Sequence, residues 1–394
     1  MKRKVPAVHE TQTTDNGQRP CLPYGRQVID ETDIEAVVQV LRSDWLTTGP
    51  RVEEFEQAVA QYVDATYAVA VSSGTAALHA AMYAIGVGPG DEVIVPAMTF
   101  AATANSVVYQ SGTPIFADVE PHTLLLDPQE VAAKITPRTK AVVAVDYAGQ
   151  PCDYAALRDI VEKRGVRLIA DACHALGARC QGKPVGSLAD VTVFSFHPVK
   201  HITTGEGGMV VTAHAELAAR MRRFRNHGIT SDHRQREQLG TWYYEMMDLG
   251  YNYRLTDFQC ALGLSQLKKL ACWLTRRRGI AARYDASLAG RHDVQPLKRR
   301  GGVEHAYHLY VIRCGQTVNR RVVYESMRAA GIGVNVHYIP VHLHPYYQRH
   351  LGTGVGLCRV AEKAYDEILS LPIHAGMIEL DVDRVLHALQ TALA

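Results

Sequence analysis

The sequence has no long apolar run, no excess of charge of either sign and no paired-cysteine motif. No segment approaches the roughly 20 apolar residues that a membrane span needs, so we expect no membrane partner. The 42 basic residues nearly balance the 40 acidic ones, which gives no electrostatic argument for nucleic acid as a partner. The eight cysteines are scattered without C-x-x-C or zinc spacing, which fits free thiols in a reducing cytoplasm and predicts no metal site.

The N-terminus also lacks the apolar region of a secretory signal, although it begins with basic residues. It is polar and without periodicity, so we interpret residues 1–22 as a flexible tail. The remaining length and the 47% hydrophobic content are sufficient for two packed domains. No G-x-G-x-x-G follows the first apolar run, and this makes a dinucleotide-binding Rossmann enzyme a weak candidate.

Short β-branched runs recur through the first half of the chain and predict an α/β fold. They cover residues 67–73, 92–100, 113–119, 140–149, 166–172, 190–196 and 207–213. Helical segments separate most of them, which indicates a mainly parallel, seven-stranded sheet covered on both faces. Only about ten residues part the last two runs, so these are expected to form a hairpin with one antiparallel strand. Helical spacing over 262–288 links this large domain (23–274) to a smaller C-terminal α/β domain (275–394).

Three features of the large domain could take part in catalysis or ligand binding, and each also has an ordinary structural explanation. Lys200 stands at the expected hairpin bend, where a charged amine is costly unless it is solvated, paired or used. Asp171 ends a buried strand, at the edge where open α/β sheets bind ligands, but it could equally cap a turn. "SSGT" before an alanine-rich helix, with Gly74 and Thr75, suits an anion, although such residues are also common N-caps.

Together, the three features favour pyridoxal phosphate as the cofactor. It needs a lysine for its aldehyde, an acid for its ring nitrogen and a cradle for its phosphate. All three occur at the ends of strands of one expected sheet.

The motifs "VSSGTAALHAA", "IADACHALGA", "FSFHPVKHITTGEGG" and "GYNYRLTDFQCALGLSQL" make the chain resemble the DegT/DnrJ/EryC1/StrS family of sugar-nucleotide aminotransferases. The resemblance extends over nearly the whole chain from about residue 22. It implies an aspartate aminotransferase-like fold, that is, fold type I of the pyridoxal phosphate enzymes. "VDYAGQP" and "VHYIPVHLHPYY" are most similar to the branch that acts in pseudaminic-acid biosynthesis.

The resemblance also implies roles for individual residues. Lys200 corresponds to the Schiff-base lysine and proton shuttle, and Asp171 to the partner of the ring nitrogen. The other cofactor-binding residues implied are Gly74, Thr75 and Ser195 at the phosphate, Phe100 on the ring face and His174 near the ring hydroxyl. The residues expected to bind the substrate are Trp45, Thr47, His197, His337 and Tyr338. Plain core packing competes as an explanation for Phe100.

Asn252 matches a family asparagine that reaches the phosphate of the neighbouring subunit's cofactor, which implies a homodimer with shared active sites. A turn asparagine is the alternative. His337, His342 and His344 could suggest a metal, since the last two would share one face of a strand. Without a cysteine or carboxylate at metal spacing, we interpret them as sugar-pocket lining.

The activity implied is transfer of an amino group from L-glutamate to C4 of a UDP-linked 4-keto-6-deoxy-N-acetylhexosamine. The alternatives are an aminotransferase for another nucleotide-linked keto sugar, such as a 4-keto pentose or a dTDP-keto sugar, and a catalytically silent cofactor-binding protein. Some family members carry histidine in place of the lysine and act as dehydratases. Because Lys200 is present, transamination is expected.

Overall fold

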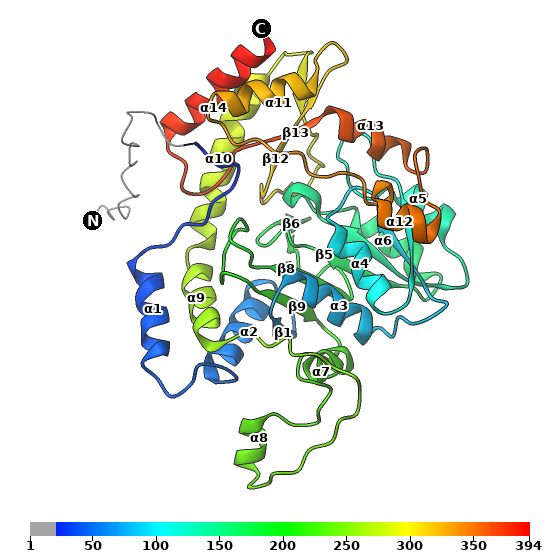
Figure 1. Cartoon of the computed structure of the whole chain (residues 1–394), viewed down its shortest axis with the longest axis vertical. Helices are drawn as coiled ribbons and strands as arrows, with labels where there is room; N and C mark the ends of the chain where they lie inside the picture. Colours follow the sequence, from blue (N-terminus) through cyan, green and yellow to red (C-terminus); the bar gives the residue numbers. More distant parts are fainter. Residues whose placement is uncertain (1–20) are drawn as a thin grey trace.

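The computed structural model describes residues 21–394 (Figure 1). Residues 1–20, which make up most of the predicted tail, lie outside the described residues. Leu22, at the end of that tail, is buried. Its backbone N–H donates to the Gly331 carbonyl at 2.9 Å, and its carbonyl accepts from Gly333 at 2.7 Å. Leu22 is therefore part of the folded body.

The elements follow one another in the alternation that the sequence predicts. The α-helices are α1 (Glu31–Leu41), α2 (Pro50–Tyr62), α3 (Gly74–Ala84), α4 (Ala101–Tyr109), α5 (Pro128–Lys134), α6 (Tyr154–Glu162), α7 (Ala215–Phe224), α8 (His233–Gln238), α9 (Asp257–Leu267), α10 (Leu270–Leu288), α11 (Arg320–Ala329), α12 (Pro345–Leu351), α13 (Arg359–Glu367) and α14 (Glu379–Leu393). The strands are β1 (Tyr67–Val71), β2 (Glu92–Pro96), β3 (Thr113–Ala117), β4 (Thr139–Val145), β5 (Arg167–Asp171), β6 (Arg179–Cys180), β7 (Lys183–Pro184), β8 (Val191–Ser195), β9 (Gly208–Thr212), β10 (Val294–Pro296), β11 (Val303–Glu304), β12 (Tyr310–Cys314) and β13 (Ile368–Leu371). Two short 3₁₀ helices, η1 (Tyr147–Gly149) and η2 (Val341–Leu343), complete the set.

A seven-stranded sheet in the order β1-β9-β8-β5-β4-β2-β3 forms the centre of the molecule. The strands from β8 to β3 pair in parallel, and β9 runs antiparallel to both β1 and β8. The predicted mostly parallel sheet and its single antiparallel hairpin strand are confirmed.

Alternation along the strands divides the core between the two faces of this sheet. On β1, Val69 and Val71 belong to the core covered by α3, α4, α6 and α7, whereas Ala68 and Ala70 belong to the core covered by α2, α9 and α10. Apolar residues on both faces explain why these strands read as nearly continuous hydrophobic runs.

A second, three-stranded sheet, β10-β12-β13, lies in the C-terminal part of the chain (Figure 1). α11, α14 and the C-terminal half of α10 pack on it around a separate core that includes Tyr284, Ile312 and Leu389. The continuous helical segment expected over 262–288 is two helices, with a break at Lys268 and Lys269. At the break, the Lys269 amine lies 2.6 Å from the Asp30 carboxylate and 2.7 Å from Asp33, which fastens the start of α1 there.

One further expectation for this region is wrong, namely that His342 and His344 share one face of a strand. The stretch 334–338 forms a loop that meets Ser370 of β13 through the Asn335–Ser370 bridge and through His337 Nδ1, 2.8 Å from the Ser370 hydroxyl. Residues 341–343 form η2, so His342 and His344 do not share the face of a strand. Pro340 and Pro345 flank this stretch, and proline cannot donate the backbone hydrogen bond that a strand interior requires.

An arm of the chain, residues 229–250 with α8, extends beyond α7 and away from the seven-stranded sheet (Figure 1). The part of this arm that follows α8 carries a dense set of exposed apolar side chains, namely Leu239, Trp242, Tyr243, Tyr244, Met246, Met247 and Leu249. Within residues 21–394, no helix combines the length and apolar character needed to cross a bilayer.

Candidate active site

Lys200 lies in the connection between β8 and β9, as the hairpin prediction requires. A turn closes behind it, because its N–H donates to the His197 carbonyl at 2.9 Å. Thr203 Oγ1 and the Thr204 N–H both donate to the Phe196 carbonyl, at 3.0 and 3.1 Å, and so fix the rest of the connection. Burial lowers the pKa of the Lys200 amine below its ordinary value, and Cys173 and Asp171 oppose part of that shift. An amine with a lowered pKa is a better base and nucleophile near neutral pH.

Asp171 is the last residue of β5, the strand that pairs with β8, and it is only 6% exposed. Its Oδ2 accepts a hydrogen bond from Thr103 Oγ1 at 2.7 Å, and its Oδ1 accepts from the Cys173 N–H at 3.3 Å. Its influence on the Lys200 pKa means that the two groups share one electrostatic environment. The structure thus brings the predicted lysine and acid together.

The anion cradle is expected at the first turn of α3, which begins at Gly74. Ser73 caps the helix by accepting from the Ala76 N–H at 3.0 Å, so the N-cap explanation holds for this residue. Gly74 is needed for space, since a Cβ there would lie 2.9 Å from Cβ and 3.2 Å from Oγ of Ser195. Thr75 continues the same turn, where backbone N–H groups have no intrahelical acceptor. Gly74 and Thr75 therefore begin a helix whose N-terminus lies against Ser195.

Residues from the C-terminal part of the chain reach the same region. The Tyr338 hydroxyl lies 3.0 Å from His174 Nε2, and the two rings stack with their centroids 6.0 Å apart. Burial, followed by the nearby Lys200 charge, lowers the pKa of His174 well below its usual value and that of His337 to about 4. Both imidazoles are therefore neutral at physiological pH. His174 Nδ1 is buried without a partner among the described groups, so it remains available to a ligand.

Phe100 precedes α4 and is 60% exposed, which rules out core packing as its explanation. Its ring centroid lies 6.0 Å from that of Tyr338, so it borders the Lys200 region. His197 is exposed at the hairpin bend, where its N–H donates to Ser195 Oγ at 3.4 Å.

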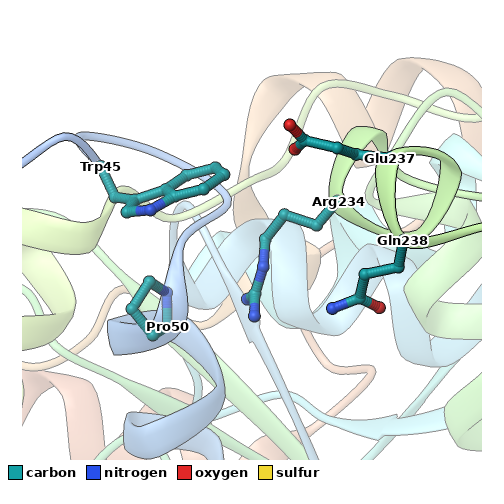
Figure 2. Close-up of a pocket in the computed structure, with 5 residues that line it drawn as sticks. All are labelled: Trp45, Pro50, Arg234, Glu237 and Gln238. Atoms are coloured by element: carbon teal, nitrogen blue, oxygen red, sulfur yellow. The ribbon is translucent and has the colours of Figure 1, made fainter. Parts of the chain in front are cut away.

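Trp45, Thr47 and Asn252 form no contact with Lys200 or its neighbours among the described residues of this chain. Thr47 bridges to Thr256, and Asn252 is exposed beside Asn226. Trp45 instead borders a cavity of about 320 Å³, together with Pro50, Arg234, Glu237 and Gln238 (Figure 2). Its indole faces the Arg234 guanidinium, whose carbon lies 5.8 Å from the ring centroid. These three residues can serve the Lys200 site only from another subunit or through a long substrate.

Sequence reasoning missed the second layer around Asp171. Thr99 lies in the bend before α4 and Thr103 in its first turn, and their hydroxyls form a hydrogen-bonded chain to the carboxylate. Asp146 follows β4, the next strand, and is fully buried. Its position at the end of a buried strand could have identified Asp146, because the same reasoning identified Asp171.

The residues present fit pyridoxal phosphate. The N-terminus of α3 at Gly74, the unpartnered His174 nitrogen and the acid at the strand end suit its phosphate, hydroxyl and ring nitrogen. A mostly parallel sheet of this order, with a lysine in its β8–β9 connection, defines a fold type I enzyme that depends on this cofactor.

The chain belongs to the DegT/DnrJ/EryC1/StrS aminotransferase family, whose model matches residues 27–390. The spore coat polysaccharide biosynthesis protein SpsC of Bacillus subtilis (strain 168) is 40% identical over 375 residues, which cover 94% of this chain and 96% of SpsC.

Two solved structures support the same conclusion. The PMP-form of the putative sugar aminotransferase Spr1654 from Streptococcus pneumoniae superposes with a TM-score of 0.90 at 34% identity, covering 94% of this chain and 99% of its own. Helicobacter pylori PseC, an aminotransferase involved in the biosynthesis of pseudoaminic acid, gives 0.89 at 33% identity, with 95% and 99% coverage. The protein is therefore a pyridoxal phosphate-dependent sugar aminotransferase.

Proposed function

We propose that the protein transfers the amino group of L-glutamate to C4 of a UDP-linked 4-keto-6-deoxy-N-acetylhexosamine, in pseudaminic-acid biosynthesis. The observation that carries the amino transfer is the shared setting of Lys200 and Asp171 at adjacent strand ends. The particular sugar is supported by the structural similarity to PseC and by the motifs "VDYAGQP" and "VHYIPVHLHPYY".

In this proposal each residue acts through a stated group. Pyridoxal phosphate, when bound, supplies an aldehyde that takes the amino group and a ring that accepts electrons. The Lys200 amine removes the α-proton of the amino donor and later delivers a proton to C4 of the sugar, and a single base on one side fixes the stereochemistry. The Asp171 carboxylate balances a positive charge on the ring nitrogen.

The remaining roles follow from position. Gly74, Thr75 and Ser195 offer N–H and hydroxyl donors to the phosphate. His174, held by Tyr338, is neutral and presents Nδ1 to the ring hydroxyl. Exposed Phe100 supplies an apolar face for a flat ring. His197, His337 and Tyr338 are the residues that we propose contact the sugar.

We also propose that the working unit is a homodimer in which each site receives Asn252 from the other subunit. Asn252 does not contact the Lys200 group of its own chain, and the arm beside it exposes Trp242 at 84% and Leu249 at 75%. Apolar groups so exposed are typical of an interface between subunits. The same pairing brings the Trp45 and Thr47 region of one chain toward the site of the other.

Absorbance tests the amino transfer. The cofactor-loaded protein should absorb in the visible range, lose that band with L-glutamate and recover it only with the matching keto sugar. A Lys200→Ala variant should not cycle, and normal cycling by this variant would refute the proposal. Recovery by a 4-keto pentose or a dTDP-linked ketone, but not by the UDP-linked hexosamine, would refute the assigned sugar alone.

Another nucleotide-linked keto sugar is the second candidate, because SpsC, at 40% identity, acts in the biosynthesis of a spore coat polysaccharide. The same panel of ketones separates the two candidates. A silent cofactor-binding protein would keep its visible band when L-glutamate is added.

Mixing two inactive variants tests the shared site. Lys200→Ala and Asn252→Ala dimers, unfolded and refolded together, should regain about a quarter of wild-type activity, because half of the dimers are mixed and each has one intact site. No recovery would mean that each site is built from a single chain.

A further inference from the structure

A chain of two threonine hydroxyls ends on the Asp171 carboxylate. Thr99 Oγ1 lies 2.7 Å from Thr103 Oγ1, and Thr103 Oγ1 lies 2.7 Å from Asp171 Oδ2. Thr99 is 2% exposed and Thr103 is fully buried, so water does not compete for either hydroxyl. Two hydroxyls are thus withdrawn from solvent and directed at one carboxylate.

Hydrogen counting fixes the direction of this chain. An ionised carboxylate only accepts, so the single Thr103 hydroxyl hydrogen is donated to Asp171. Thr99 must then donate to the Thr103 oxygen. That second bond polarises the first, because linked hydrogen bonds strengthen one another in a buried environment. The chain therefore directs two aligned hydroxyl dipoles at the Asp171 carboxylate.

The two oxygens of Asp171 are treated differently. Oδ2 accepts the short bond from Thr103, whereas Oδ1 accepts a longer bond, 3.3 Å, from the Cys173 N–H. Fixing Oδ2 sets the rotation of the carboxylate and leaves Oδ1 as the less satisfied acceptor.

The neighbouring strand end provides an internal comparison. Asp146 accepts two bonds on one oxygen, from the Cys152 N–H and the Tyr154 hydroxyl, both at 2.9 Å. Its Oδ2 is buried without a partner, and burial raises the pKa of this group to about 7. One sheet edge therefore carries two buried acids, and only at Asp171 does a dedicated hydroxyl chain support the charge.

We propose that Thr103, supported by Thr99, is the positioning residue that keeps Asp171 ionised and oriented, so that Asp171 holds the proton on the ring nitrogen of pyridoxal phosphate. This inference rests on the role proposed above for Asp171. It assigns to the "TFAAT" segment (99–103) the control of the cofactor's charge, although neither threonine touches the substrate.

The test compares variants in the cofactor-loaded protein. Thr103→Val removes the hydroxyl and keeps the shape, Thr103→Ser restores the hydroxyl, and Thr99→Val shortens the chain by one link. Thr192→Val is the matched control, because Thr192 is fully buried on the adjacent strand β8 and its hydroxyl has no partner among the described residues.

Two readouts require only bound cofactor. The first is the midpoint of the pH titration of the visible band, and the second is the dissociation constant of pyridoxal phosphate, followed by tryptophan fluorescence. Thr103→Val should raise the midpoint by about one pH unit and weaken binding about ten-fold, since a hydrogen bond to a charged group is lost. The midpoint rises because a ring nitrogen without its proton no longer repels the proton at the lysine nitrogen.

Thr103→Ser should restore both values, Thr99→Val should give a smaller change in the same direction, and Thr192→Val should match the wild type. Wild-type values in Thr103→Val would overturn the proposal. Equal defects in Thr103→Val and Thr103→Ser would also overturn it, because packing of the methyl group would then be the cause. If Thr103→Val does not fold, unchanged values in Thr99→Val overturn it instead. Failure of every keto sugar to accept an amino group would refute the proposed function. It would not affect the comparison of these variants, because both readouts need only bound cofactor.

Discussion

Replacing Asp146 with asparagine should flatten the dependence of the free energy of unfolding on pH between about 4 and 7. Asp146 is fully buried, and burial raises its pKa from 3.8 to about 7. Below pH 4 the carboxyl is protonated in both the folded and the unfolded chain. As the pH rises further, the unfolded chain ionises first, so stability falls until the folded chain also ionises near pH 7.

The size of this effect follows from the shift in pKa. About three units at 1.36 kcal/mol per unit give a loss of at most about 4 kcal/mol across this range. Asparagine keeps the acceptor for Cys152 and Tyr154 and has no proton to lose. Its buried amide adds a cost that does not change with pH, so the slope carries the information rather than the absolute stability.

Urea unfolding at pH 5 and pH 8 measures this slope in Asp146→Asn and in the wild type. Asp127→Asn is the matched control, because Asp127 caps α5 through the Gln129 N–H at 2.8 Å and asparagine caps equally well. Repeating the series at two cofactor concentrations separates folding from cofactor binding, since only the latter depends on concentration. Equal slopes for Asp146→Asn and the wild type would refute the reasoning.

Three further substitutions have definite expectations. Gly208→Ala should destabilise the protein by about 1–3 kcal/mol, because its Cβ would lie 2.4 Å from the Ser73 carbonyl oxygen; unchanged urea unfolding would contradict this. Gly279→Ala, on the exposed side of α10 with nothing within 4 Å of the new Cβ, should instead stabilise the protein by about 0.5–1 kcal/mol in the same assay. Tyr338→Phe removes the hydroxyl bonded to His174 and should lower kcat/KM roughly two- to ten-fold with little change in unfolding, so wild-type kinetics would show that this bond is dispensable.

The sequence was most informative about the large sheet. Its strands are buried on both faces, so each appears as a short apolar run, and the ten-residue gap before Gly207 allowed only a hairpin. Lys200 and Asp171 could be found because their places at strand ends follow from that pattern. The end of the chain was harder, because the loop at 334–338 and η2 have strand-like composition, and their shape depends on the prolines and on packing against the large sheet.

Contacts between distant segments could not be derived from one sequence. Tyr338 reaches His174, and Thr103 reaches Asp171, through tertiary packing that no local pattern encodes. The break at Lys269 has the same origin, because Asp30 and Asp33, which hold its amine, lie far away in the sequence. Asn252 and Trp45 were singled out by resemblance alone, and one chain does not bring them to Lys200.

The sheet order has a consequence for the way this enzyme is made. β1 pairs only with β9, the last strand of the large sheet to leave the ribosome, and Gly74 follows β1 whereas Ser195 ends β8. The opening strand must therefore wait for most of the domain to be synthesised before it gains its neighbour, and such distant pairing slows folding. A nascent chain therefore cannot bring the N-terminus of α3 next to Ser195 until β8 has been synthesised.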